Sequence, residues 1–147
     1  MPQMQHLLVV SCLVRNPGGN ILVVRHNRRG WELPQGRVEA GESLLAALHR
    51  EVREETGVTI VSPRLAATWS KLSAPSALIL GFLADHTRGE PTPSMETPEV
   101  VWLNAAVIRK RIDHPANRDR FEALLSFDGC VRFYSYETEP YRCQLEN

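Results

Sequence analysis

Three acidic residues with helical spacing, Glu51, Glu54 and Glu55, are the residues of this chain best suited to chemistry. Glu51 and Glu55 are four positions apart, so on a helix their side chains meet over one turn, and Glu54 lies beside them. Carboxylates crowded on a half-buried face repel one another, and burial adds to that cost. A bound divalent cation would remove the cost, so the pattern predicts a metal site.

A helix must position these carboxylates, and its bounds can be predicted. Ser43 is suited to the N-cap, residues 44–56 contain neither Gly nor Pro, and Gly57 can adopt the left-handed conformation that ends helices. The apolar stripe that we expect to face the core consists of Leu45, Leu48 and Val52. Glu51 and Glu54 flank this stripe, which places them at the border between core and solvent.

The stretch around the predicted helix resembles the signature of the Nudix hydrolases, G-x5-E-x7-R-E-U-x-E-E-x-G-U, in which U is an aliphatic residue. The matching positions are Gly36, Glu42, Arg50, Glu51, Val52, Glu54, Glu55, Gly57 and Val58. The preceding Trp31-Glu32-Leu33-Pro34 is similar to the lead-in of that family. The resemblance implies an α/β fold of the Nudix type, an α/β/α sandwich with a mixed β-sheet. It also implies a hydrolase that acts on phosphoric anhydrides.

The resemblance further implies a role for each acid. Glu51 and Glu55 would bind Mg²⁺, or Mn²⁺ in its place, and Glu54 would be a further ligand or the base that activates water. The main-chain carbonyl of Gln35 is implied as another metal ligand. Mg²⁺ prefers such hard oxygen ligands and polarises a phosphoanhydride for attack by water. The alternative to a metal site is a solvated acidic helix face.

Two further members of the implied catalytic set, Glu42 and Arg50, would act structurally, with the Arg50 guanidinium holding a carboxylate in place. In many members of the family an acidic residue from a downstream loop joins the metal site. Glu96 and Glu99 are both placed for this role, and we favour Glu99.

Substrate binding requires cations and groups that read a base. Arg25, at the end of a predicted strand, and Arg28 could grip phosphates, although ordinary surface arginines are the alternative. Asn117 lies in a Pro-Ala-Asn stretch similar to that of MutT-type enzymes. It either reads a purine edge through its amide or caps the helix that follows. Trp31 and Trp102 either stack on a base or, as we favour, pack in the core.

Composition limits the class of protein. The chain has 147 residues, of which 43% are hydrophobic and 23% charged, so we expect one globular domain over residues 1–147. The formal net charge is zero, which predicts neither a nucleic acid nor a membrane as partner. The three cysteines lack metal-ligand spacing and the start lacks the basic region of a signal peptide. We therefore expect reduced thiols and a cytoplasmic location, with Cys130–Cys143 the one pairing left open.

Strands are predicted on both sides of the helix. The predicted elements are a hairpin of residues 7–15 and 21–26, strands 59–71 (interrupted near Pro63), 77–85 and 100–103, a loop at 87–98, helices 105–111 and 117–125, and an edge strand 131–137. This edge strand belongs to a C-terminal extension, residues 127–147, which the family resemblance does not require. The order of elements indicates a mixed sheet covered on both faces.

The substrate implied by the resemblance is a nucleoside diphosphate linked to another group, and a (d)NTP or related small nucleotide is our leading prediction. Pro34-Gln35-Gly36 is similar to enzymes that act on dinucleoside polyphosphates or RNA 5′ ends, so that activity stays open. A nucleotide-sensing module without turnover and an isoprenoid diphosphate isomerase are the alternatives from other classes. The isomerase requires a catalytic cysteine, whereas Cys12 falls in a predicted core strand. A homodimer through the tail also stays open.

Overall fold

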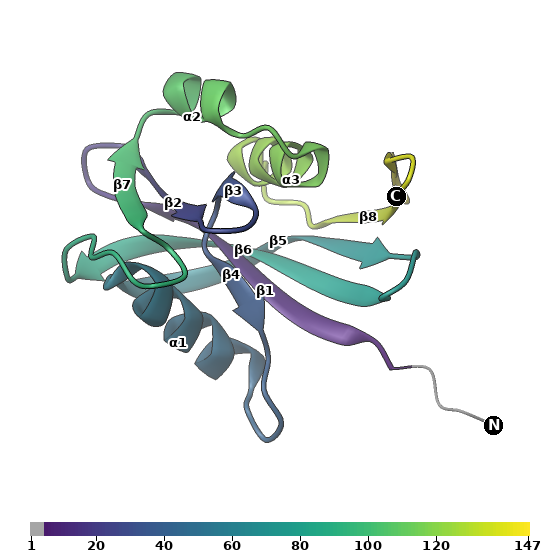
Figure 1. The fold of residues 1–147 in the computed structure, drawn as a ribbon, viewed down its shortest axis with the longest axis horizontal. Coiled ribbons are helices and arrows are strands. Elements are labelled where there is room, and N and C mark those ends of the chain that lie inside the picture. Colours follow the sequence, from purple (N-terminus) through teal and green to yellow (C-terminus); the bar gives the residue numbers. More distant parts are fainter. Residues whose placement is uncertain (1–4) are drawn as a thin grey trace.

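A computed structural model describes residues 5–147 as one mixed sheet with helices on both faces (Figure 1). The strands are β1 (Leu7–Arg15), β2 (Ile21–His26), β3 (Gly30–Glu32), β4 (Gln35–Arg37), β5 (Thr59–Lys71), β6 (Ala77–Arg88), β7 (Glu99–Leu103), β8 (Arg132–Glu137) and β9 (Arg142–Leu145). The helices are α1 (Leu44–Thr56), α2 (Ala105–Arg111) and α3 (Pro115–Leu125). The strand order is β3-β2-β1-β6-β5-β8-β9, with β4 beside β1 and β7 beside β2.

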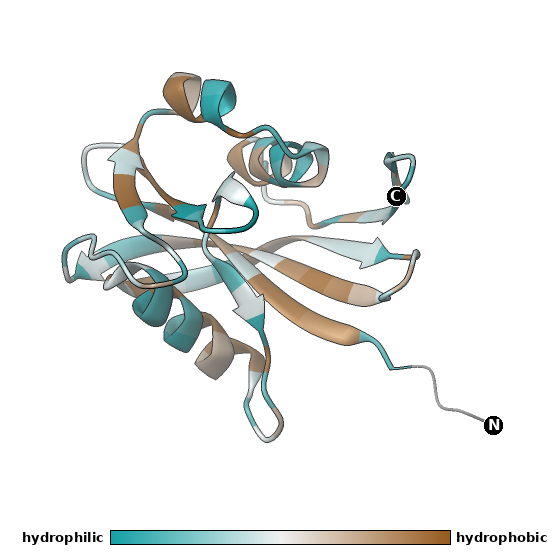
Figure 2. Cartoon of the chain, in the orientation of Figure 1, coloured by the Kyte–Doolittle hydropathy of each residue, from teal (hydrophilic) through white to brown (hydrophobic). Residues whose placement is uncertain are grey.

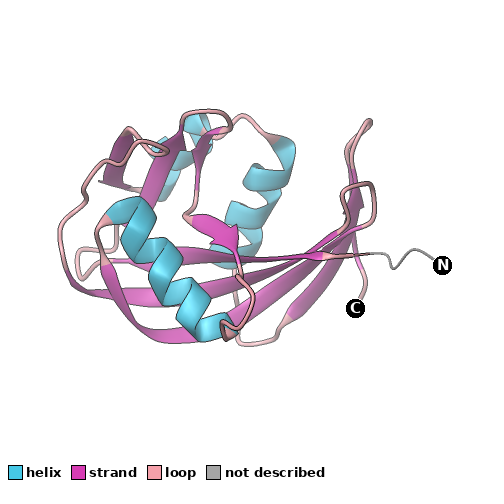
Figure 3. Ribbon diagram, turned by 60° about the horizontal axis from the view of Figure 1, so that its bottom comes forward, coloured by secondary structure: helices cyan, strands magenta, loops and turns pink. Residues whose placement is uncertain are grey.

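Two hydrophobic cores lie on opposite faces of the sheet, because successive residues of a strand point in opposite directions. Cys12 of β1 belongs to the core under α1, together with Leu48 and Val52. The next residue, Leu13, belongs to the core under α2 and α3, together with Phe121. Figure 3 shows α1 on one side of the strands and α3 on the other, and Figure 2 shows the hydrophobic run along β1. The predicted α/β/α sandwich with a mixed sheet is confirmed.

Helix α1 begins and ends where the sequence predicts. The Ser43 side chain accepts a hydrogen bond from the Ala46 amide at 3.2 Å, and Gly57 adopts a left-handed conformation with φ of 79°. The predicted stripe is wrong at Leu45, whose exposed fraction is 47%, whereas Leu48 is only 1% exposed. Ala47 takes its place on the buried face, because α1 meets the sheet along a line rotated away from Leu45.

Strand β5 contains the predicted interruption as an irregularity in its pairing with β6. The register shifts between Val61 and Arg64, and Ser62 there has a φ of 56°. Pro63 lies within this break, where its missing amide hydrogen costs no ladder bond. Strand β6 runs to Arg88, three residues beyond the predicted end, because it pairs with the start of β5 at Thr59. The loop that follows is correspondingly shorter than predicted.

The C-terminal part differs from the prediction in two ways. Strand β8 is not an edge strand, because it pairs in parallel with β5 on one side and antiparallel with β9 on the other. Helix α3 begins at Pro115 rather than Asn117, and its N-cap is His114, whose Nδ1 accepts a hydrogen bond from the Ala116 amide. Strand β9 is the outer strand, and with β8 it forms a C-terminal hairpin.

The cysteines, all within the described part of the chain, are free: Cys12 is buried, Cys143 is half-buried and Cys130 is exposed. Cys12 is therefore the core thiol that its strand position predicts, and burial raises its pKa well above the ordinary value. No helix among residues 5–147 has the length and apolar character needed to cross a membrane.

Candidate active site

The acids of α1 face the short strand β4. The Gln35 amide donates a hydrogen bond to Glu55 Oε1 at 2.8 Å, so the start of β4 holds this carboxylate in place. The neighbouring Gly36 lies so close to Glu51 that an added Cβ would be 2.0 Å from the Glu51 carboxyl carbon. A residue without a side chain is therefore required where the backbone of β4 meets α1. Two of the three predicted carboxylates thus meet at one stretch of backbone.

Arg50 ties the remaining acids together. Its Nε donates to Glu42 Oε2 at 2.6 Å and its Nη2 to Glu42 Oε1 at 2.8 Å, which is a two-pronged ion pair. Its Nη1 lies 2.8 Å from Glu51 Oε1 and 3.2 Å from Glu54 Oε2. The hydrogen bond from Arg50 lowers the pKa of Glu42 to about 2. Glu54 is the outermost acid of the set, since its side chain is 59% exposed.

Burial opposes the charge on the two inner carboxylates. It raises the pKa of Glu55 to about 8, and the hydrogen bond from Gln35 offsets only part of this effect. Burial also raises the pKa of Glu51, although Arg50 acts in the opposite direction. Two desolvated carboxylates one helical turn apart lack sufficient countercharge from the protein. That deficit is the condition under which a bound cation stabilises a site most.

A loop between β6 and β7 brings Glu96 to the same place. The Thr97 hydroxyl, which is fully buried, donates to the Glu55 carbonyl at 2.7 Å and so fixes the loop to the end of α1. The Asn27 amide donates to the Glu96 carbonyl at 2.9 Å from the other side. Glu96 therefore lines the same hollow as Glu51 and Glu55.

Glu99 and Arg25, by contrast, pair with each other. They are cross-strand partners in the β2–β7 ladder, and Arg25 Nε donates to Glu99 Oε2. Both side chains are substantially exposed, and neither lines the hollow around Glu51 and Glu55. The preference for Glu99 over Glu96 is thus corrected by the register of β7, which turns Glu99 toward Arg25.

The hollow, which we call the carboxylate cleft, has a volume of about 410 Å³. It is lined by His26, Asn27, Arg28, Arg29, Gln35, Gly36, Arg37, Glu51, Glu55 and Glu96. Arg28 lines the cleft together with the acids, and His26 shapes its turn by accepting the Arg28 amide hydrogen at Nδ1, 3.1 Å away. The lining of the cleft combines acidic and basic side chains, which suits a metal-bridged polyanion.

The donor set of the cleft fits a hard divalent cation, because carboxylate oxygens and the adjacent β4 backbone are the ligands that Mg²⁺ and Mn²⁺ prefer. Across residues 5–147, no three acidic, His or Cys side chains converge on one point as they stand. Arg50 Nη1 lies between Glu51 and Glu54 and supplies the positive charge there. A cation bound by Glu51 and Glu55 would therefore compete with Arg50 for the Glu51 carboxylate.

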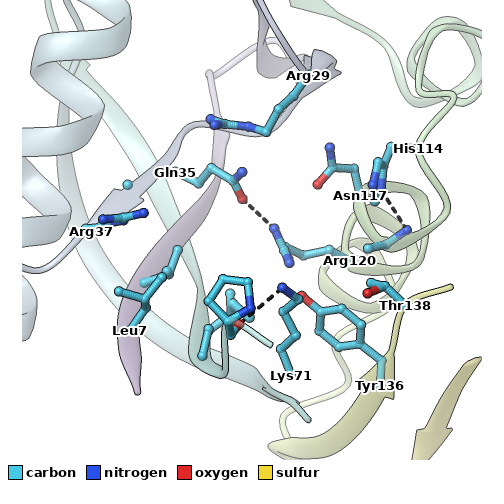
Figure 4. A pocket seen from close by; sticks show the side chains of 16 residues that line it. Leu7, Arg29, Gln35, Arg37, Lys71, His114, Asn117, Arg120, Tyr136 and Thr138 are labelled. Atoms are coloured by element: carbon cyan, nitrogen blue, oxygen red, sulfur yellow. Dashed lines mark hydrogen bonds between the residues drawn. The ribbon is translucent and has the colours of Figure 1, made fainter. Parts of the chain in front are cut away.

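A second hollow, which we call the side pocket, adjoins the cleft and has a volume of about 410 Å³ (Figure 4). The two share Arg29, Gln35, Gly36 and Arg37. The floor of the side pocket is aliphatic and consists of Leu7, Val9, Ala77 and Ile79 from the parallel strands β1 and β6. Its polar wall contains Lys71, His114, Asn117, Arg120, Tyr136 and Thr138. This size falls in the range of small-molecule sites.

A buried hydrogen-bond network links the two hollows through Glu32, whose exposed fraction is 1%. Glu32 pairs with Arg29 at 2.7 Å and accepts from Gln35 Nε2 at 3.1 Å and from Asn117 Nδ2 at 3.2 Å. Asn117 is therefore not the helix cap of the alternative interpretation, because it lies within the first turn of α3 and lines the side pocket. Its amide nitrogen is occupied by Glu32, and its amide oxygen remains available to accept.

The tryptophans pack as the core interpretation predicts. Trp31 contacts the core under α3 and carries the Arg111 guanidinium 4.8 Å from its ring centre. Trp102 contacts the core under α1 and meets the His86 ring edge-on. Neither lines the cleft or the side pocket.

Sequence reasoning missed Glu32, Lys71 and Arg120. Arg120 is three residues after Asn117, so the helical repeat places both on one face and could have indicated it. Lys71 gave no such signal, because it reaches the site only through the pairing of β5 with β6.

Comparisons with known proteins agree with this geometry. Residues 5–125 match the family model of the NUDIX domain. The chain is 30% identical over 135 residues to the uncharacterized Nudix hydrolase YvcI of Bacillus subtilis (strain 168), which covers 87% of this chain and 85% of that protein. It is 36% identical over 83 residues to the NAD-capped RNA hydrolase NudC of Photobacterium profundum, covering 56% of this chain but only 31% of that protein.

Solved structures share the fold. A MutT protein from Bacillus halodurans superposes with a TM-score of 0.81 at 23% identity, over 95% of this chain and 97% of that one. From the complete signature, the family model and the fold together, the chain belongs to the Nudix family of hydrolases, which act on phosphoric anhydrides and generally use a divalent metal.

Proposed function

We propose that this protein is a Mg²⁺-dependent pyrophosphohydrolase that cleaves a phosphoanhydride bond in a small nucleotide, a nucleoside diphosphate linked to another group. The observation that carries the proposal is the pair Glu51 and Glu55, two desolvated carboxylates at the β4 backbone in a cleft that basic side chains also line. A polyanion that carries a hard cation offers the cation to the acidic side chains and its own oxygens to the basic side chains of the cleft. Mn²⁺ can replace Mg²⁺ because both accept carboxylate oxygens.

Each residue of the cleft has a task in this proposal. Glu51 and Glu55 hold the cation, with the Gln35 carbonyl as a further ligand and Glu96 in the place first assigned to Glu99. Glu54, which is exposed beside Arg50 and does not line the cleft itself, would be a further ligand or the base that accepts a proton from the attacking water. Glu42 keeps Arg50 in position, and Arg28 contacts phosphate oxygens. The cation lowers the pKa of bound water and neutralises charge on the anhydride.

The substrate in this proposal is small rather than a long nucleic acid, because the formal net charge of the chain is zero. The side pocket is continuous with the cleft and has room for the part of the substrate beyond the diphosphate. Asn117 keeps its amide oxygen free to accept a hydrogen bond from a base in that pocket.

An assay of product release tests the proposal. The purified protein is incubated with NTPs, ADP-ribose, dinucleoside polyphosphates and 5′-triphosphorylated RNA, with Mg²⁺, Mn²⁺ or EDTA. We expect metal-dependent hydrolysis of at least one nucleotide, and a loss of at least about 100-fold in kcat in Glu55→Gln, since such groups contribute that much to catalysis. Glu137→Gln, an exposed acid of β8 outside the cleft, is the matched control and keeps full activity.

Two results would contradict the proposal. Nucleotide binding without turnover on the whole panel would identify a sensing module instead. Equal activity of Glu55→Gln and the unmodified chain would remove the cleft from the reaction.

A further inference from the structure

The side pocket contains cations that the carboxylate cleft does not use. Lys71 and Arg120 line the side pocket, and neither of them lines the cleft. Arg29 and Arg37, by contrast, border both hollows and are within reach of a diphosphate in the cleft. A diphosphate bound to the acids of α1 through a cation therefore leaves Lys71 and Arg120 without an assigned ligand.

Neither Lys71 nor Arg120 forms an ion pair with a described residue, although the Glu32 carboxylate lies near enough to act electrostatically on Arg120. Within residues 5–147, the carboxylates make no ion pair with either side chain. Lys71 Nζ donates only to the Pro75 carbonyl at 3.1 Å, and Arg120 Nη1 donates to the neutral Gln35 amide (Figure 4). No Asp or Glu of the described residues lines the side pocket. The pocket therefore has a net positive lining.

Arg120 also has an unused donor. Its exposed fraction is 5%, and its Nε, which is buried, finds no hydrogen-bond partner among the described residues. The guanidinium lies 5.6 Å from the centre of the Trp69 ring, and burial lowers its pKa. An unpartnered buried donor is costly and is rare in native proteins. A negatively charged ligand oxygen in the side pocket would supply the missing acceptor.

The shape of the side pocket indicates what carries that charge. At about 410 Å³ the pocket is much larger than a single phosphate ion, and its floor is an aliphatic surface of β1 and β6. A planar apolar ring fits the floor, and an acidic group on the same moiety fits Lys71 and Arg120. Tyr136 and Thr138 of the C-terminal hairpin close the outer wall.

We infer that the side pocket recognises a moiety bearing its own phosphate, in addition to the diphosphate that is cleaved, through Lys71 and Arg120. This inference rests on the proposed function, because that function puts the scissile diphosphate in the cleft. The substrate is thereby narrowed to nucleotides with a further phosphate on the group beyond the scissile bond.

Calorimetric titration in EDTA tests the inference with ligands that contain no anhydride. The probes are adenosine and guanosine 5′-monophosphates and the corresponding 3′,5′-bisphosphates. We expect the bisphosphate of at least one base to bind about 10-fold more tightly than its monophosphate, the gain of one charge-assisted hydrogen bond. Lys71→Ala reduces the ratio of the two affinities, bisphosphate to monophosphate, to about 1–2. Lys110→Ala, a lysine of α2 outside the pocket, leaves the ratio unchanged.

The outcomes separate the inference from the proposed function, because these probes cannot be hydrolysed as anhydrides. Equal affinities within each pair, a failure of all four probes to bind, or a ratio that survives Lys71→Ala overturns the inference even if the enzyme is active. An affinity ratio of bisphosphate to monophosphate that depends on Lys71 supports the inference. We expect the same ratio in Glu55→Gln, because Glu55 does not line the side pocket. Arg120→Gln, if it folds, gives the same loss as Lys71→Ala.

Discussion

Glu55 is the residue at which burial and charge oppose each other most strongly. Glu55 is 5% exposed, its carboxylate accepts a hydrogen bond from the Gln35 amide, and it lies one turn from Glu51. One hydrogen bond does not compensate for the loss of water around an ionised carboxylate. The folded chain therefore favours the protonated acid unless a cation is bound. The role proposed for Glu55 in metal binding is therefore opposed to its contribution to stability.

The pH dependence of stability in EDTA follows from the Glu55 pKa of about 8, which is raised from 4.5. Between these values the folded carboxyl keeps a proton that the unfolded chain has released, so stability falls as pH rises through this window. Glu55→Gln removes this pH-dependent loss, because the Gln side chain does not ionise. Its amide oxygen can still accept the hydrogen bond from the Gln35 amide. We expect the stability advantage of Glu55→Gln to grow from pH 5 to pH 8, by up to about 1.4 kcal/mol per pH unit.

Urea unfolding at a series of pH values measures this difference. In saturating Mg²⁺ the order reverses, because only the unmodified chain gains from metal binding. A difference between the two proteins that stays constant with pH in EDTA would contradict the prediction.

At the scale of elements, the site depends on the close approach of β4 to α1. Helix α1 has local start and stop signals in Ser43 and Gly57. Its Arg50 Nη2 donates a hydrogen bond to the Arg37 carbonyl at 3.0 Å, which connects the helix to β4. Gly36 is the contact point at which no side chain fits. The atoms that a methyl group would meet there are those of the flexible Glu51 carboxylate rather than rigid backbone.

Gly36→Ala should therefore impair activity more than stability. The added methyl group displaces the Glu51 carboxylate, and we expect kcat to fall at least about 10-fold and half-maximal rate to require more Mg²⁺, as is typical when a metal ligand is disturbed. The melting temperature changes little. Gly18→Ala is the control, because its added Cβ would meet a single side-chain atom at 3.4 Å, far from the site. Full activity of Gly36→Ala would show that Glu51 is not held by this contact.

The elements that sequence predicted well are those with local signals. The caps of α1, the turn after β1 and the break near Pro63 depend on residues that lie next to one another in sequence. Arg25 and Glu99 were interpreted separately, as a phosphate ligand and a metal ligand, whereas the β2–β7 register places them opposite each other. Such cross-strand pairs are set by register over a long sequence separation, which the hydrophobic pattern alone does not specify.

At the scale of the whole molecule, the C-terminal hairpin is part of the sheet rather than a tail. Strand β8 continues the sheet beyond β5, and the Leu72 amide donates to the Tyr136 carbonyl at 2.9 Å. The Tyr134 ring stacks on the Trp69 ring with centres 5.4 Å apart, so the hairpin also contacts the core under α3. The sequence predicted a strand here but not its interior position, because nothing in residues 131–137 identifies the strand that pairs outside it.

Tyr134→Ala should reduce the free energy of unfolding by about 2 kcal/mol, through lost burial and the lost aromatic pair. Phe133→Ala is the matched control, since Phe133 is 49% exposed and points to the opposite side of β8, so its cost is much smaller. Equilibrium unfolding in urea compares the two. Equal effects of the two substitutions would show that the Trp69 stack does not fasten the hairpin.

The outer wall of the side pocket comes from Tyr136 and Thr138, whereas the acids of the cleft come from α1 and from the loop between β6 and β7. In the proposed function, substrate choice and bond breaking therefore depend largely on separate segments of the chain, which are linked by the shared residues Gln35 and Gly36 and by the Glu32 network. Lengthening, shortening or exchanging the hairpin is therefore a route by which natural divergence or a laboratory library can retune what is accepted while the reactive machinery stays untouched.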